Sequence, residues 1–275
     1  MLLSACALAL LTSCASTGTA RGTRRILFVG NSVIYTNNLP AVLARIIDAQ
    51  SDRPAYHVDM FARGGVTLTE LGQDPRVLDL LASGRYDVVV LQERGGDDLC
   101  VLAPEDRETA ECQALIDSHI RLARLAREHG ARVLYLGTYQ LAPEVSQALV
   151  RAERRLGTQM VAQYVEVSER LRNLRELQSE LPWLYVDKGH PGVATTALMG
   201  VLLYETLEGS APLPFELCTR TELYTPKWKH DGIMTHAEIV AETQPARCVL
   251  SQAQMDIITQ GAAAALSSSD ARPAL

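Results

Sequence analysis

Several features that would assign a chain to a membrane, metal or cofactor class are missing from these 275 residues. The apolar run at the N-terminus ends within the first 14 residues, which is shorter than the roughly 20 residues needed to span a bilayer. The cysteines show no Cys-x-x-Cys spacing and the histidines no H-x-x-x-H or H-E-x-x-H pattern, so we expect no metal. Gly64-Gly65 and Gly95-Gly96 lack the spacing and the lysine of a phosphate-binding loop, so we expect no cofactor.

A basic excess is absent as well. The chain carries 26 Lys and Arg against 32 Asp and Glu, a net charge of −6, whereas binding to a nucleic-acid backbone requires a concentrated basic face. The arginines at 121–127 and 151–155 recur at helical spacing beside acids, which is typical of solvated helix faces. We therefore expect no nucleic-acid partner.

The first residues carry an export pattern. Residues 1–14 are apolar and end in Leu11-Thr12-Ser13-Cys14, and small polar residues follow to Gly22. This is typical of a bacterial lipoprotein signal that is cleaved before Cys14, whose thiol receives the lipid. No Lys or Arg precedes the apolar run, so the position of the true start codon stays open. We expect a lipid-anchored protein on the periplasmic face of a bacterial membrane; the alternative is an apolar tail on a cytosolic protein.

Four cysteines remain after this segment. An even number in an exported chain favours disulfides. The favoured pairs are Cys100 with Cys112 and Cys218 with Cys248, because each pair brackets an irregular segment with little apolar content. Four unrelated buried thiols are the alternative.

Short β-branched runs alternate with amphipathic stretches, a pattern that predicts a parallel sheet covered by helices on both faces. Strands are expected at 26–30, 55–61, 87–92, 132–138 and 183–186, and helices at 39–51, 66–83, 111–129, 144–179 and 192–207. The fold class is an α/β three-layer sandwich with a flavodoxin-like five-stranded sheet in the order 2-1-3-4-5. We divide the chain into a signal and linker (1–22), this domain (23–210) and a loop-rich C-terminal appendage with a terminal helix (211–275), which would pack on the core or form one wall of the active-site cleft.

Polar residues follow two of the expected strands. Ser32 comes directly after the first strand, and Asp187 and His190 stand three positions apart after the last. A serine hydroxyl needs an imidazole to accept its proton and a carboxylate to hold that imidazole in the correct tautomer. Because sites in open α/β sheets lie outside the carboxyl ends of the strands, we expect the three side chains to meet there.

This arrangement resembles the SGNH (GDSL-like) hydrolases over residues 25–209. Gly30-Asn31-Ser32 matches the first family block with Asn in place of Asp, and residues 187–191 match Asp-x-x-His-Pro. The resemblance implies an oxyanion hole formed by the backbone N–H groups of Ser32 and of Gly64 or Gly65. Gln92 stands where the family places an Asn donor, which is a second departure.

The resemblance implies a serine esterase that hydrolyses O-acyl esters, with acetyl groups on carbohydrate as a plausible substrate class. Asn31, Glu93 and Lys188 are further candidates for substrate binding, and Asn31 is also expected to brace the loop. Asp97 and Asp98 are interpreted as solvated turn residues. Two alternatives stay open: an O-acyltransferase that uses the same acyl-enzyme, and a non-catalytic envelope binding protein on a decayed hydrolase scaffold.

Overall fold

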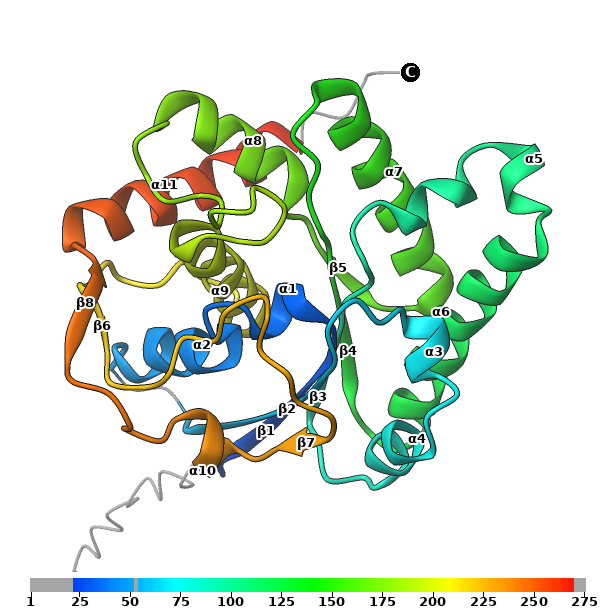
Figure 1. Ribbon diagram of the computed structural model, residues 1–275, viewed down its shortest axis with the longest axis horizontal. Helices are drawn as coiled ribbons and strands as arrows, with labels where there is room; N and C mark the ends of the chain where they lie inside the picture. Colours follow the sequence, from blue (N-terminus) through cyan, green and yellow to red (C-terminus); the bar gives the residue numbers. More distant parts are fainter. Residues whose placement is uncertain (1–21, 52–53, 270–275) are drawn as a thin grey trace, which may run out of the picture.

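The computed structural model describes residues 22–51 and 54–269, which form a central sheet between two layers of helices (Figure 1). The sheet has six strands in the order β5-β4-β3-β1-β2-β7. The first five are parallel to their neighbours, and β7 pairs antiparallel with β2. Their bounds are β1 Arg24–Gly30, β2 Tyr56–Ala62, β3 Val88–Leu91, β4 Arg132–Leu136, β5 Gln163–Val165 and β7 Ile233–Met234.

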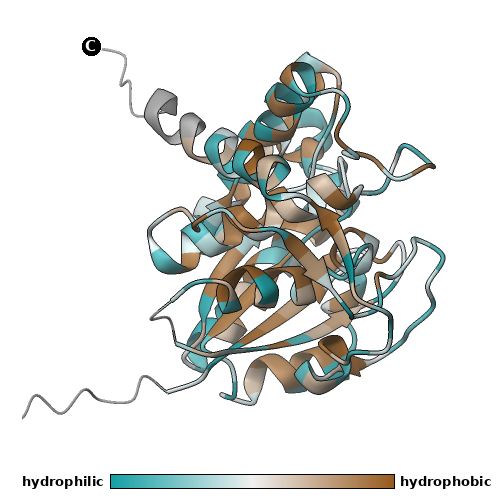
Figure 2. Cartoon of the chain, turned by 90° about the vertical axis from the view of Figure 1, so that its left-hand side faces the viewer, coloured by the Kyte–Doolittle hydropathy of each residue, from teal (hydrophilic) through white to brown (hydrophobic). Residues whose placement is uncertain are grey.

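Alternate residues of the strands supply two separate cores, because successive side chains point to opposite faces. Helices α1 (Ser32–Tyr35), α2 (Leu39–Asp48), α8 (Ser168–Leu177), α9 (Val193–Glu208) and α11 (Gln252–Ser269) cover one face. Helices α3 (Leu68–Leu71), α4 (Pro75–Ala82), α6 (Ala110–Glu128) and α7 (Pro143–Met160) cover the other. Figure 2 shows the apolar strands enclosed between these layers.

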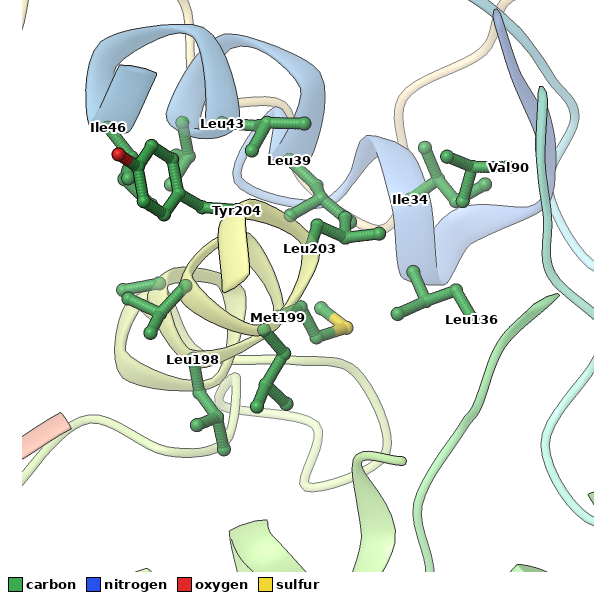
Figure 3. Close-up of a cluster of buried hydrophobic side chains, with 14 of the residues drawn as sticks. Ile34, Leu39, Leu43, Ile46, Val90, Leu136, Leu198, Met199, Leu203 and Tyr204 are labelled. Carbon is green, nitrogen blue, oxygen red and sulfur yellow. The ribbon is translucent and has the colours of Figure 1, made fainter. Parts of the chain in front are cut away.

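Helices α2 and α9 form the densest part of the first core. Leu39, Leu43 and Ile46 of α2 face Leu203 and the neighbouring side chains of α9 (Figure 3). Gly200 permits this close approach, since a Cβ at its position would lie 2.7 Å from Ile46 Cδ1. Helix α9 begins at Val193, two residues after the proline of the Asp-x-x-His-Pro segment, so this packing also anchors that segment to the domain.

The predicted architecture is confirmed, with one strand misplaced. The fifth parallel strand is β5, which lies inside the stretch expected to be a single helix over 144–179. Helix α7 ends at Met160, and Val161 adopts a left-handed conformation that turns the chain into the sheet. A three-residue strand carries almost no periodic signal. Residues 183–186 are instead a loop, in which Val186 is 89% exposed.

The appendage packs against the sandwich and adds an edge strand to its sheet. It contains β6 (Leu217–Thr219), β7, α10 (His236–Ile239), β8 (Arg247–Leu250) and the start of α11. Strands β6 and β8 form a separate antiparallel pair, and Cys218 bonds to Cys248 across it. Cys100 bonds to Cys112 between the turn at Asp97–Val101 and α6. Both favoured pairings are present.

No helix in the described ranges is both long and apolar enough to cross a bilayer. The signal segment and Cys14 fall outside the described residues, so the expected lipid anchor stays a prediction.

Replacing Gly192 by Ala is expected to lower the free energy of unfolding by about 1–3 kcal/mol, the usual cost of overpacking. A Cβ there would lie 2.1 Å from the carbonyl oxygen of Pro182, a backbone atom that cannot rotate away. Urea unfolding measures the effect. Gly95→Ala is the matched control, because its Cβ would meet no atom closer than 3.8 Å. Equal stability of the two variants would contradict the close approach.

Candidate active site

Ser32 is held at the carboxyl end of β1 by its neighbour Asn31. The Asn31 side chain caps helix α1: its Oδ1 accepts from Val33 N at 3.1 Å, and its Nδ2 donates to Val66 O at 3.2 Å. Ser32 is thus the first residue of a four-residue helix with a fixed start. Both ends of the Asn31 side chain thus brace the loop; Asn31 also lines the pocket beside Ser32, so its expected role in substrate binding stays a prediction.

His190 connects Ser32 to Asp187. Its Nε2 lies 2.9 Å from Ser32 Oγ, and its Nδ1 lies 2.8 Å from Asp187 Oδ2. The second carboxylate oxygen of Asp187 accepts from the backbone N–H groups of Gly189 and His190, each at 3.0 Å. Burial raises the pKa of Asp187, but the hydrogen bonds from His190 and Gly189 outweigh it and lower the pKa below its ordinary value. Asp187 is therefore a carboxylate that can hold a proton on His190 Nδ1 and leave Nε2 free to accept from Ser32.

Two residues that the sequence analysis missed fix this loop in place. Asn37 Nδ2 donates to Pro191 O at 2.8 Å, and the Tyr139 hydroxyl donates to Gly189 O at 3.0 Å. Asn37 and Asn38 both adopt positive φ, which asparagine tolerates better than most residues. An Asn-Asn pair just after the nucleophile was the available signal.

A pocket of about 190 Å³ opens beside Ser32 and His190. Its other walls come from the ends of β3 and β4 and from the His190 loop; they include Arg94, Thr138, Tyr139 and Gln140. A space of this size suits a small acyl group.

Backbone groups engage both ends of the Gln92 amide, which the sequence analysis expects to donate to an oxyanion. Its side chain is fully buried, its Oε1 accepts from Asn31 N at 3.3 Å, and its Nε2 donates to the backbone oxygen of Glu93. Both polar ends of the amide are therefore used to hold the backbone. The expectation that Gln92 donates to the oxyanion is not supported; the longer stem bends the amide back onto the chain.

Glu93 and Lys188, the other two candidates for substrate binding, do not line the pocket beside Ser32. Glu93 is fully buried and accepts from Leu68 N at 2.9 Å and Arg94 N at 2.6 Å. Lys188 is exposed, adopts a φ of 60°, and is not among the residues that line the pocket beside Ser32.

Gly64 lies against Tyr35, the last residue of the helix that begins at Ser32. A Cβ on Gly64 would come within 2.9 Å of the Tyr35 hydroxyl, which donates to Pro226 O at 2.9 Å. Burial raises the pKa of Tyr35. Gly65 has a φ of 70°, which glycine adopts without strain. Both glycines are exposed at this edge of the sheet, so their role in an oxyanion hole stays a prediction.

A buried group of ionisable residues lies behind the loop after β3. It consists of Glu93, Asp98, His119, Tyr135 and Glu153. Burial raises the pKa of Glu93 to about 7 and also raises the pKa values of Asp98 and Glu153, while it lowers that of His119. The expectation that Asp98 is a solvated turn residue is wrong: it is 1% exposed and hydrogen-bonds to the Tyr135 hydroxyl.

One potential group of metal ligands exists in the described ranges. It comprises Glu216, Cys218 and Cys248, and both sulfurs are already joined in a disulfide. This leaves a single carboxylate, which gives no support for a metal at that place.

No protein-family profile matches the chain, and no curated protein matches it. Several solved structures do. A DUF4886 family protein from Bacteroides uniformis matches with a TM-score of 0.59 and 13% identity, over 90% of this chain and 96% of its own. Axe2, an acetylxylan esterase from Geobacillus stearothermophilus, matches with a TM-score of 0.52 and 13% identity, over 69% and 97%. TesA matches with a TM-score of 0.50 and 22% identity, over 68% and 99%.

The chain shares the three-layer α/β fold of these solved structures, which is the fold that the resemblance of its sequence motifs implies. Axe2 and TesA are matched over nearly their whole lengths, but the matches cover only 69% and 68% of this chain.

We predict that Gln92→Ala destabilises the protein by about 1–3 kcal/mol, because the buried Asn31 N–H loses its acceptor. Urea unfolding measures the loss. Ser179→Ala, an exposed change, should leave stability within about 0.5 kcal/mol of the wild type. Unchanged stability of Gln92→Ala together with reduced turnover would instead restore its role as an oxyanion donor.

The buried carboxyls also predict how stability depends on pH. A carboxyl whose pKa is raised by folding stabilises the protein fully below its unfolded pKa of about 4.3, and this contribution is lost as pH rises through the raised value. Glu153→Gln cannot ionise. Between about pH 5 and pH 8.5, the wild type should therefore lose more stability than Glu153→Gln in urea unfolding. Equal losses would show that Glu153 does not titrate in this range.

Proposed function

We propose that this protein is a serine esterase in which Ser32 is the nucleophile, His190 the general base and Asp187 the orienting carboxylate. The observation that carries the proposal is the continuous hydrogen-bonded relay from Ser32 Oγ through His190 to Asp187. Such a relay activates a hydroxyl that is otherwise a poor nucleophile at neutral pH. An intact relay favours an enzyme over a binding protein on a decayed scaffold.

The reaction proceeds in two steps. His190 Nε2 accepts the Ser32 proton as Oγ attacks the ester carbonyl, and Asp187 stabilises the resulting imidazolium. The backbone N–H groups of Ser32 and of Gly64 or Gly65 are the proposed donors to the oxyanion. The imidazolium then gives its proton to the departing alcohol, which leaves an acyl-serine. Water, deprotonated by His190, releases the acid and restores the serine.

An acetyl group on a carbohydrate is the proposed substrate. The pocket of about 190 Å³ beside Ser32 has room for a small acyl group. Axe2, whose fold this chain shares, is an acetylxylan esterase. Its catalytic mutants alter a serine, an aspartate and a histidine, and the last two are three positions apart in that protein. Asp187 and His190 have the same spacing.

We further propose that the protein is exported and tethered to a membrane by lipid on Cys14. The support is the apolar segment that ends at that cysteine and the two disulfides, which persist mainly in oxidising compartments.

Ser32→Ala should reduce hydrolysis of 4-nitrophenyl acetate by at least about a thousandfold while the thermal transition stays within a few degrees of the wild type. The hydroxyl is the attacking group and contributes little to packing. Steady-state kinetics and calorimetry measure the two quantities. Ser179→Ala, on the surface, is the control and should keep full activity. Full activity of Ser32→Ala would rule out the proposed mechanism.

A further inference from the structure

A second hollow, lined by Tyr35 of the helix that begins at Ser32, is larger than the pocket already described. This groove has a volume of about 680 Å³ and is lined on one side by Tyr35, Arg63 and Gly64. Residues 226–231 of the appendage form its other side. Tyr35 belongs to the four-residue helix that begins at Ser32, and Gly64 is a candidate for the oxyanion hole, so the groove lies on the same side of the sheet edge as the proposed reaction centre.

The appendage segment is held firmly against the nucleophile helix. The Tyr35 hydroxyl donates to Pro226 O at 2.9 Å, and Asn37 N donates to Tyr224 O at 2.9 Å. The Trp228 ring stacks on the ring of Tyr224 at a centroid distance of 4.2 Å and on that of His230 at 4.9 Å. These contacts help to fix this wall of the groove.

Three cations line this groove: Arg63, Lys227 and Lys229. In the part of the chain that the structure describes, none of the three makes an ion pair or a side-chain hydrogen bond. The chain has only three lysines, and two of them are here although the net charge is −6. A concentration of unpaired positive charge on an acidic protein requires an explanation.

Carboxylates also lie near this groove. Asp231, which lines it, pairs with Arg76 at 2.8 Å, and Asp74 pairs with the same arginine at 2.7 Å. Arg63 contributes to the lowered pKa of Glu70, after the hydrogen bonds from Thr67, and to that of Asp74, after those from Arg76, so its charge is partly offset. Lys227 and Lys229, both exposed, are the groove cations that remain for a ligand.

We infer that this groove binds the alcohol portion of the ester and that this portion carries an anionic group, such as the carboxylate of an acidic sugar. The inference rests on the proposed esterase function, since it assigns the part of the substrate that leaves from Ser32. The small pocket receives the acyl group, and Arg63, Lys227 and Lys229 attract the negative charge of the alcohol. Opposite charge along a groove raises both encounter rate and binding of the matching substrate.

The test compares esters that differ in charge but little in shape. We expect the wild type to hydrolyse 4-acetoxybenzoate with a kcat/KM about fivefold or more above that of neutral 4-acetoxybenzamide, and this ratio to fall toward one in 0.5 M salt. In Lys227→Gln/Lys229→Gln the ratio should fall several-fold. Arg124→Gln/Arg151→Gln removes the same two charges from exposed helix positions and should keep the wild-type ratio. A third ester, 4-acetoxyphenyl phosphate, shows whether a phosphate is preferred to a carboxylate.

The possible outcomes separate the two proposals. Ser32-dependent hydrolysis of both esters without any preference for the anion overturns the inference and leaves the esterase intact. A preference that the Lys227→Gln/Lys229→Gln change does not reduce also overturns it. Failure of the wild type to hydrolyse any of the esters counts against the esterase itself.

Discussion

The hydrogen bonds of the His190 side chain are the interaction on which the site depends. They join two segments that are 158 residues apart, one at the end of β1 and one at the start of α9. Neither segment could fix this geometry alone. Helix α1 holds the hydroxyl because Asn31 caps it, and Asp187 holds the imidazole because backbone N–H groups of its own loop fix the carboxylate. The sheet and the packing of α2 on α9 then bring the segment with Ser32 and the segment with His190 together.

The parts of the fold with strong local signals were predictable. Four parallel strands stand out as short β-branched apolar runs and the helices as amphipathic stretches, and the Ser32 and Asp187-x-x-His190 motifs follow directly from the order of residues. The predictions that were wrong concern segments whose conformation depends on contacts with residues distant in the chain. Strand β5 has three residues and lies where a helix pattern runs on, while the apolar segment 183–186 is a loop tied down by the buried Trp183.

The sequence also did not predict the direction in which some polar side chains point. Gln92 and Glu93 stand at the carboxyl end of β3, where a site is expected, but both turn inward to satisfy backbone groups. Asp98 follows two glycines and looks like a turn residue in the sequence. Its side chain is nevertheless buried, where it accepts a hydrogen bond from Tyr135 and lies close to His119. Whether a polar side chain faces solvent or a buried partner depends on residues distant in the chain, such as Leu68 and Tyr135, and a single sequence does not show them.

The C-terminal appendage adds three features to the sandwich. Its short strand extends the sheet, its disulfide closes the β6–β8 pair, and its aromatic segment places two lysines in the groove that Tyr35 also lines. In the proposed function the sandwich supplies the reaction chemistry, and in the further inference the appendage supplies a charged wall for the alcohol portion of the substrate.

Labelling with a fluorophosphonate probe tests the central claim most directly, because only a serine activated by a neighbouring base reacts readily. After trypsin digestion and mass spectrometry, the account predicts one adduct on the peptide 26–45, at Ser32, and its loss in His190→Ala. An unlabelled protein, or labelling of Ser32 that persists without the imidazole, would contradict it.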